Sequence, residues 1–313
     1  MRIGYDYGGL LIGSPLDFHG MPLASPSERR SCDIEINFAV GALPRRRDPI
    51  HVWKGRYALA LEERDAGGWT IRYRDAATIG CDDRGAVLDC VCSDAAQAPV
   101  LADILTRRVL PRLTSLHGRM PIHAAALATD DGAVLLFGAS GAGKSTMTAA
   151  LARRGWQILS DDMSILSGWR DPHVWQTAPG VSLWADSCAA LELPDAHCRP
   201  IEGYEGKFWY LPEPLEPVGR VPVRALIFLG ERGETVAWRR SSGPQAVMTA
   251  ASQMVRFNPA NTAESATALD NFKRLAMALP CYTFAYPRAY DALPAATDGI
   301  ARILADARRQ ADL

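Results

Sequence analysis

The sequence has no long apolar run and no excess of one charge, and each absence argues against a class of function. No apolar stretch approaches the ~20 residues that a membrane-spanning helix needs. The 34 Lys and Arg residues balance 35 Asp and Glu residues, a formal net charge of −1, so neither nucleic acid nor an anionic membrane is expected as a partner. The first residues, MRIGYDYGGLLIG, lack the pattern of a secretory signal peptide. We therefore expect a cytoplasmic protein.

Cysteines are few and scattered, which argues against a disulfide framework or a metal cluster. The seven cysteines are odd in number. Cys90 and Cys92 lie two apart in VLDCVC, so a strand would place both side chains on one face. No second closely spaced cysteine pair and no histidine cluster in the sequence completes a metal site. We expect reduced cysteines that pack as small apolar side chains.

One stretch of the chain carries a complete phosphate-loop motif. The apolar run Ala133–Phe137 suits a buried strand. The following loop, GASGAGKS at Gly138–Ser145, fits G-x-x-x-x-G-K-[ST] at every fixed position. Glycines let such a loop wrap a phosphate closely with inward-pointing N–H groups. A helix predicted over Lys144–Arg154 would add its positive end.

The motif predicts a nucleotide-binding segment of nine consecutive residues. In it, Lys144 can reach the β- and γ-phosphates and the Ser145 hydroxyl can ligate Mg²⁺. The segment comprises Gly138, Ala139, Ser140, Gly141, Ala142, Gly143, Lys144, Ser145 and Thr146.

An acidic pair follows the next predicted strand, Trp156–Leu159. Asp161 and Asp162 lie seventeen and eighteen residues after Lys144. Phosphoryl transfer needs a carboxylate for Mg²⁺ and a base near the acceptor hydroxyl, and two adjacent carboxylates at a strand end can divide these tasks. The alternative is a turn pair, which Asp also favours. His123, in the apolar strand PIHAAAL, is either close to this site or a core residue.

The pattern of the chain changes at about residue 98. Residues 1–98 predict a β-rich module with an irregular start, one strand over 32–40, and further strands over HVWKGRYALAL, WTIRYR and AVLDCVC. Residues 99–313 predict a mixed α/β (α+β) domain. It opens with an amphipathic helix over 99–116 and contains the phosphate loop. Its strand over 223–229 is expected to pair with 235–239, and its last third is mainly helical.

Together these residues resemble the HPr kinase/phosphorylase family. The shared features are a strand with His123, then GASGAGKST, a helix ending in ARRGW, and SDD; HAAA before the loop is typical of bacterial HPr-kinase-related proteins. The similarity spans roughly residues 100–310 and is strongest over 121–162. It implies a phosphoenolpyruvate-carboxykinase-like core and transfer of the γ-phosphoryl group of ATP to a serine.

The resemblance also implies roles for individual residues. Asp161 matches the carboxylate that deprotonates the acceptor serine, Asp162 and Ser145 would serve the metal site, and His123 would tune the acidic pair. Lys207 and Arg240 are candidates for further phosphate contacts or are surface residues. Tyr286-Pro287-Arg288 also occurs in the related proteins, but the sequence supplies no mechanism for it.

Four features depart from the family pattern. Thr146 stands where Glu commonly follows the loop, and the segment 177–182 lacks the metal-binding Glu of HPr kinases. The signature loop of the bifunctional enzymes is absent, which argues against phosphorylase activity. Residues 1–95 do not resemble the family's N-terminal domain, so the hexamers known there do not fix an oligomeric state here, and a homo-oligomer stays open.

We therefore expect an ATP- and Mg²⁺-dependent kinase that acts on a serine of a protein or of a ribosomally made precursor peptide, as in lasso-peptide clusters. Two alternatives stay open: a nucleotide-gated binding or regulatory ATPase module without a phosphoacceptor, and a small-molecule kinase. The sequence does not distinguish ATP from GTP and does not identify the acceptor.

Overall fold

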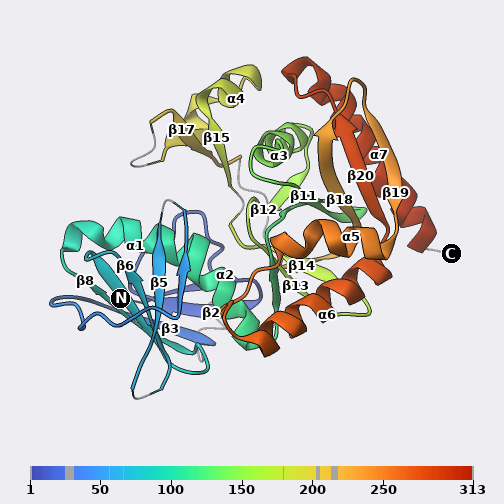
Figure 1. Ribbon diagram of the computed structural model, residues 1–313. Helices are drawn as coiled ribbons and strands as arrows, with labels where there is room; N and C mark the ends of the chain where they lie inside the picture. The colour runs from blue at the N-terminus through green and yellow to red at the C-terminus, as the bar shows by residue number, and fades with distance from the viewer. Residues whose placement is uncertain are drawn as a thin grey trace. The chain divides into compact units, whose positions relative to one another are not determined.

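The computed structural model describes residues 2–24, 32–55, 57–65, 67–178, 180–201, 205–212 and 218–311. The chain forms two compact units: Met1–Pro121 with Val255–Ala268, and Ile122–Met254 with Leu269–Leu313 (Figure 1). The boundary expected after residue 98 falls inside the first unit, because the helical segment that follows packs there. No helix in the described ranges has the length and apolar composition to cross a membrane.

The first unit is built on an eight-stranded sheet, in the order β1-β2-β3-β8-β7-β6-β5-β4. Its strands are β1 Ile3–Tyr7, β2 Leu10–Ser14, β3 Ile34–Val40, β4 His51–Trp53, β5 Leu59–Glu63, β6 Trp69–Tyr73, β7 Ala77–Cys81 and β8 Val87–Cys92. Cys90 and Cys92 are free and buried in β8, which confirms that they belong to the core.

Two expectations for this unit were wrong. Residues 3–14 form a β-hairpin, not an irregular segment. Gly8 and Gly9 both have positive φ, 65° and 72°, the backbone that a two-residue hairpin turn requires. The stretch HVWKGRYALAL is two strands, because its ends fold back and His51 lies opposite Leu61.

A broken helical segment covers residues 95–117 of the first unit. It consists of a 3₁₀ turn Ala95–Gln97, α1 Ala98–Ile104, a π-helical turn Leu105–Val109, α2 Leu110–Leu113 and a 3₁₀ turn Thr114–His117. The expected apolar face is buried, and the Tyr7 hydroxyl of β1 donates to the Thr106 carbonyl at 3.1 Å. Pro111 lacks a backbone N–H, which disturbs the regular α-helical pattern here.

The second unit contains a large mixed sheet. Its path runs β12-β10-β11-β18-β14-β13-β9, and β20 pairs with β18 and with β19. The strands are β9 Met120–Ile122, β10 Ala125–Thr129, β11 Gly132–Phe137, β12 Gln157–Ser160, β13 Ser164–Ser167, β14 His173–Trp175, β18 Arg220–Arg232, β19 Ala237–Ser241 and β20 Cys281–Tyr286. The expected pairing of 223–229 with 235–239 was wrong, because β20 lies between them and pairs with both.

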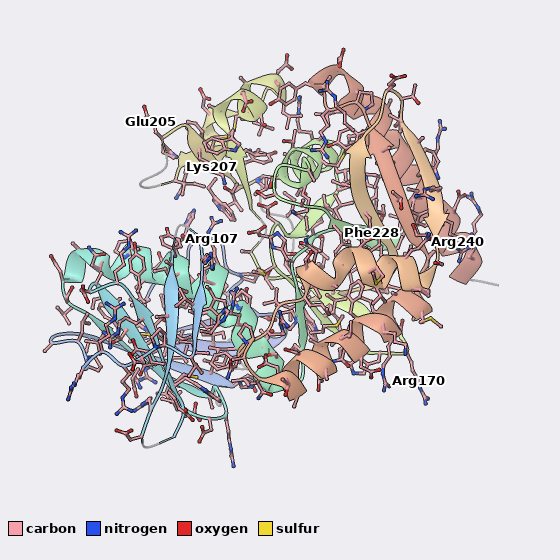
Figure 2. All side chains as sticks on the ribbon, viewed as in Figure 1. Arg107, Arg170, Glu205, Lys207, Phe228 and Arg240 are labelled. Carbon is pink, nitrogen blue, oxygen red and sulfur yellow. The ribbon has the colours of Figure 1, made fainter. Side chains whose placement is uncertain are left out.

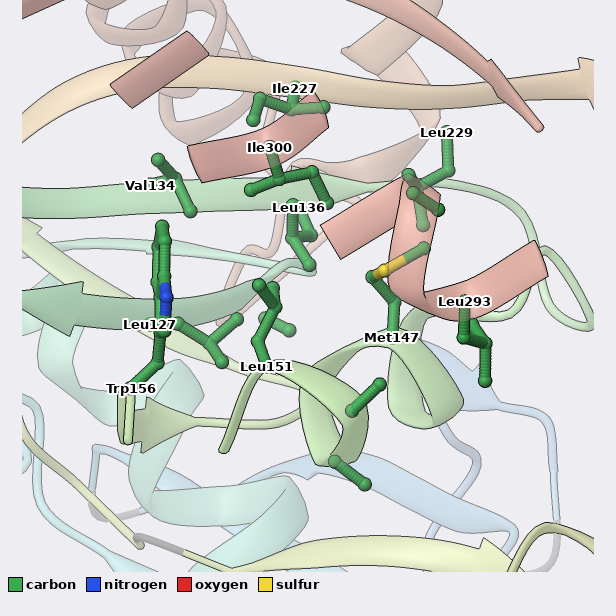
Figure 3. Close-up of a cluster of buried hydrophobic side chains, with 14 of the residues drawn as sticks. Leu127, Val134, Leu136, Met147, Leu151, Trp156, Ile227, Leu229, Leu293 and Ile300 are labelled. Atoms are coloured by element: carbon green, nitrogen blue, oxygen red, sulfur yellow. The ribbon is translucent and has the colours of Figure 1, made fainter. Parts of the chain in front are cut away.

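Helices cover both faces of this sheet. The helices are α3 Lys144–Ala152, α5 Gly243–Ala250, α6 Thr262–Ala278 and α7 Leu293–Ala311, with a 3₁₀ turn Ala251–Gln253 after α5. On one face Phe272 of α6 meets Phe137 edge-on, and Phe137 stacks on Phe228 (labelled in Figure 2). On the other, Val134 and Leu136 pack with residues of α3 and α7 in the main core (Figure 3). Successive side chains of a strand point to opposite faces of the sheet, so Phe137 lies on one face and Val134 and Leu136 lie on the other.

A smaller three-stranded sheet, β15-β17-β16, lies beside α3. Its strands are β15 Val181–Trp184, β16 Cys198–Pro200 and β17 Lys207–Tyr210, with α4 Ala185–Ala190 and a 3₁₀ turn Asp195–His197. The Arg153 side chain at the end of α3 donates to the Leu191 carbonyl after α4. The glycines at 203 and 206 predict a loop between them, and residues 203 and 204 of that loop lie outside the described residues.

A buried ion pair lies in the first unit. Arg72 and Glu62 are 3% and 1% exposed, and Arg72 Nε donates to Glu62 Oε1 at 2.8 Å. Arg72 also donates to the Pro44 carbonyl at 3.0 Å. Replacing Arg72 with Met leaves Glu62 buried without its partner, so the free energy of unfolding should fall by about 3 to 5 kcal/mol in urea denaturation.

The exposed pair Arg47–Asp65 offers a matched control. The Arg47→Met protein should unfold at nearly the wild-type urea concentration, because water screens an exposed pair. Equal midpoints for the Arg72→Met and Arg47→Met proteins would contradict the role assigned to the buried pair.

Candidate functional site

Strand direction brings five segments of the second unit to one edge of its sheet. β18 runs parallel to β11, β20 runs parallel to β18, and β11 and β12 are both antiparallel to β10. The C-terminal ends of β11, β12, β18 and β20 therefore meet at the same edge as the start of β10. This edge collects the loop after Phe137, Asp161-Asp162, Gly230, the segment after Tyr286, and His123.

The loop between β11 and α3 has the backbone that a phosphate loop needs. Gly141 and Gly143 adopt positive φ, 78° and 87°, and the Ala142 N–H donates to the Ala139 carbonyl at 3.0 Å. α3 begins at Lys144, directly after Gly143. The first N–H groups of a helix have no intrahelical acceptor, so this end of α3 presents donors to an anion.

The Lys144 side chain lies within this loop. It is 7% exposed, and its Nζ donates to the Gly138 carbonyl at 2.6 Å. Burial lowers the pKa of Lys144, and the charges of Asp162 and Asp161 oppose that shift. The ammonium is thus a desolvated cation within range of two carboxylates, and a nearby phosphate would stabilise its charged form.

The two aspartates of the acidic pair differ in their surroundings. Asp161 is 8% exposed, and its Oδ2 accepts the Ser182 N–H at 3.0 Å. The Asp162 side chain is 66% exposed, and its Oδ1 lies 3.5 Å from Nδ1 of His123. His123 therefore lies beside the pair. The segment 177–182, which lacks a metal-binding Glu, contributes a backbone donor to Asp161.

A chain of hydroxyls fixes the acidic turn to the start of β10. The Ser160 and Ser164 hydroxyls lie 2.7 Å apart, and Ser164 Oγ donates to the Ala124 carbonyl at 2.9 Å. The backbone N–H of His123 donates to the Gln253 carbonyl at 2.8 Å. These contacts explain why HAAA and SDD, about 37 residues apart in sequence, lie together.

The donor set suits Mg²⁺ bound together with a nucleotide. Among the described residues, no group of three or more His, Cys, Asp and Glu side chains is arranged to hold a metal ion alone. The Ser145 hydroxyl and the Asp162 carboxylate are oxygen groups of the kind that Mg²⁺ prefers, and Mg²⁺ commonly completes its shell with phosphate oxygens and water. These residues fit the nucleotide-bound ion and not a site built from protein ligands alone.

Two residues that the sequence did not explain hold the loop from the end of β20. Arg288 donates to the carbonyls of Gly141 at 2.7 Å and Gly230 at 3.0 Å. The Tyr286 hydroxyl makes a long 3.5 Å hydrogen bond to the Ala142 carbonyl. The stretch Tyr286-Pro287-Arg288 was the signal in the sequence. Its contacts could not be predicted, because Tyr286 and Arg288 bind loop residues more than 140 positions earlier in the chain.

The Thr146 side chain is directed to α4. Its hydroxyl lies 3.3 Å from Ser187 Oγ, which lies 3.1 Å from the Tyr290 hydroxyl. Tyr290 belongs to the 3₁₀ turn Tyr290–Ala292 before α7. Thr146 thus links the phosphate-loop helix to two neighbouring elements through its side chain, while its backbone N–H remains in the first turn of α3.

Lys207 and Arg240 lie on different sides of the second unit (Figure 2). Lys207 of β17 stands over the Trp184 ring, 5.4 Å from its centroid. The Arg240 side chain, on β19, donates to the Gln310 side chain. In the strand pairing, Arg240 lies opposite Tyr282, at the start of β20. The phosphate loop lies near the other end of β20, so Arg240 is a surface residue remote from the loop.

Comparisons with known proteins do not assign the chain to a family. No family model matches it, and no curated protein matches it. Among solved structures it is similar to the Hpr(Ser) kinase/phosphatase from Coxiella burnetii, at 14% identity and a TM-score of 0.29. That similarity covers 62% of this chain and 99% of the other. A TM-score this low carries no weight for the activity, which therefore has to be argued from the site.

Gly143 offers a direct test of the loop geometry. A Cβ there would lie 2.3 Å from the Tyr286 hydroxyl, on a backbone with φ 87°. The left-handed backbone alone costs a side chain about 1 to 2 kcal/mol. We expect Gly143→Ala to weaken ATP binding by about tenfold or more, measured by calorimetric titration.

Gly155 provides the matched control, because its φ is 85° and an added Cβ would meet no atom within 4 Å. Gly155→Ala should keep wild-type ATP affinity. Adding Tyr286→Phe to Gly143→Ala removes the clashing hydroxyl and should restore part of the affinity. Wild-type affinity in the Gly143→Ala protein would show that the loop does not hold the nucleotide in this conformation.

Proposed function

We propose that the protein is an ATP- and Mg²⁺-dependent kinase that transfers the γ-phosphoryl group to a serine hydroxyl of a protein or precursor peptide. The observation that carries this proposal is the meeting of the Lys144 ammonium, the N-terminal end of α3 and the Asp161-Asp162 pair at one sheet edge. Cation, helix end and carboxylates are the groups that phosphoryl transfer requires. A cytoplasmic location and a homo-oligomer stay predictions.

Each residue of the site has a distinct task in this proposal. The backbone of Gly138–Gly143 surrounds the phosphates, and Lys144 leaves the Gly138 carbonyl to neutralise charge on the transferred group. Ser145 and Asp162 would hold Mg²⁺, which would neutralise phosphate charge when bound. Asp161, oriented by the Ser182 N–H, accepts the proton of the acceptor serine.

His123 is a positioning residue in this scheme. Its Nδ1 faces Asp162 at 3.5 Å, so it acts on the substrate through that carboxylate. The hydrogen bond from its backbone N–H to the Gln253 carbonyl anchors the main chain that carries the ring. His123 therefore sets the orientation of Asp162 toward the metal.

Removing the Lys144 ammonium should abolish most of the transfer. We expect Lys144→Ala to lower phosphorylation by about 10²- to 10³-fold, because it removes a preorganised cation from the transferred group. The measurement is intact-mass spectrometry of peptides encoded beside the gene, incubated with the protein, ATP and Mg²⁺. The control is Lys207→Ala, which removes a lysine outside the loop and should keep wild-type transfer. Equal transfer by the two variants would contradict the proposal.

Replacing the proposed base should separate binding from chemistry. Asp161→Asn keeps the shape of the side chain but cannot accept the serine proton. We expect ATP binding by titration within about twofold of wild type and a loss of transfer of about 10²- to 10⁴-fold. If the Asp161→Asn protein phosphorylates the peptide normally while Asp162→Asn does not, the two roles are reversed.

A nucleotide-gated module without a phosphoacceptor is the second candidate. The hydroxyl chain from Thr146 through Ser187 to Tyr290 favours it, because it connects the start of α3 with α4 and with the segment before α7. ATP binding that alters the protease sensitivity of α4, with no transfer to any peptide or metabolite, would select this function.

A further inference from the structure

The two sides of the phosphate loop carry opposite charges. In the sheet, β10 and β12 lie on one side of β11, and β18 and β20 lie on the other (Figure 1). Asp161 and Asp162 follow β12, so they lie on the first side. The segment after β20 approaches from the second side, where Arg288 donates to the carbonyls of Gly141 and Gly230. The side of the loop away from the carboxylates therefore carries a cation.

The Arg288 guanidinium uses its rim to hold the loop. The N–H groups of a guanidinium lie in its plane, so two hydrogen bonds to carbonyls engage the rim and not the flat faces. Both acceptors are uncharged, so these contacts leave the positive charge in place. The Arg288 side chain is exposed, and a Cβ added at Gly141 would meet no atom within 4 Å. There is thus open space beside the loop where the guanidinium lies.

An exposed aromatic ring follows two residues after Arg288. Tyr290 is 40% exposed, and its hydroxyl lies 3.1 Å from Ser187 Oγ. Ser187 Oγ lies 3.3 Å from the hydroxyl of Thr146, in the first turn of α3. These contacts tie the hydroxyl end of the ring to the helix that follows the loop. A guanidinium and an aromatic ring are the side-chain groups on which planar bases stack.

The polarity of a nucleoside triphosphate matches this arrangement. In the proposed kinase the γ-phosphate is directed to Asp161 and Asp162, where the acceptor serine loses its proton. The nucleoside is attached at the other end of the triphosphate. It therefore lies on the opposite side of the loop, the side from which Arg288 and Tyr290 approach.

We propose that Arg288 and Tyr290 form the nucleoside subsite, in which the flat face of the Arg288 guanidinium stacks on the base and the Tyr290 ring borders it. This inference rests on the proposed function, which sets the direction of the nucleotide, and it adds the part of the site that recognises the nucleoside. Arg288 then has two tasks, because it holds the loop with its rim and binds the base with its face.

The test is calorimetric titration with ATP and with inorganic tripolyphosphate, both in Mg²⁺, because tripolyphosphate has the three phosphates and no nucleoside. The wild-type protein should bind ATP more tightly than tripolyphosphate. Arg288→Met should lower the ratio of the two affinities by about two- to thirtyfold, as expected for the loss of a guanidinium–ring contact. Loss of loop geometry or of positive charge alone would weaken tripolyphosphate at least as much, because tripolyphosphate carries more charge.

A second variant and a control complete the test. Tyr290→Leu should lower the same ratio, and it serves if Arg288→Met binds too weakly to measure. Arg274→Met, which removes an exposed arginine of α6 that pairs with Asp270, should keep both affinities. An unchanged ratio in the variant that can be measured would overturn the inference and leave the proposed function standing. Binding of neither ligand by the wild-type protein would overturn the proposed function, and the inference with it.

Discussion

The direction of the strands in the second unit is the constraint on which its candidate site depends. β10 runs opposite to β11 and β12, so its first residues reach the edge where those two strands end. β18 runs parallel to β11, β20 runs parallel to β18, and both end at that edge. If β20 ran the other way, Tyr286 and Arg288 would lie at the far side of the sheet and the loop would lose both contacts.

Two opposing influences act on the protonation of Lys144 at this edge. Burial favours its neutral form, and the charges of Asp162 and Asp161 favour the ammonium. The Gly138 carbonyl accepts from its Nζ, which satisfies the group without neutralising it. A cation in this position gains more from a phosphate than an exposed lysine would, because little water competes. In the proposed kinase, one desolvated group therefore contributes both to binding the phosphate and to stabilising its charge.

The sequence predicted local structure well and long-range contacts poorly. The loop, the start of α3 at Lys144 and the core position of Cys90 follow from glycine spacing and apolar periodicity, which neighbours in sequence determine. The contact of Arg288 with Gly141 spans 147 residues and has no local signature. The placement of β20 between β18 and β19 likewise overrides the preference of adjacent strands to pair.

Equilibrium titration of the wild-type protein with ATP, in Mg²⁺ and again in EDTA, tests the account most directly. The loop, Lys144, Ser145 and the acidic pair together predict saturable binding that is clearly tighter with Mg²⁺, because the ion offsets repulsion between the phosphates and the two carboxylates. Absence of ATP binding under both conditions would contradict the account, since a folded loop of this geometry would then have no phosphate to hold.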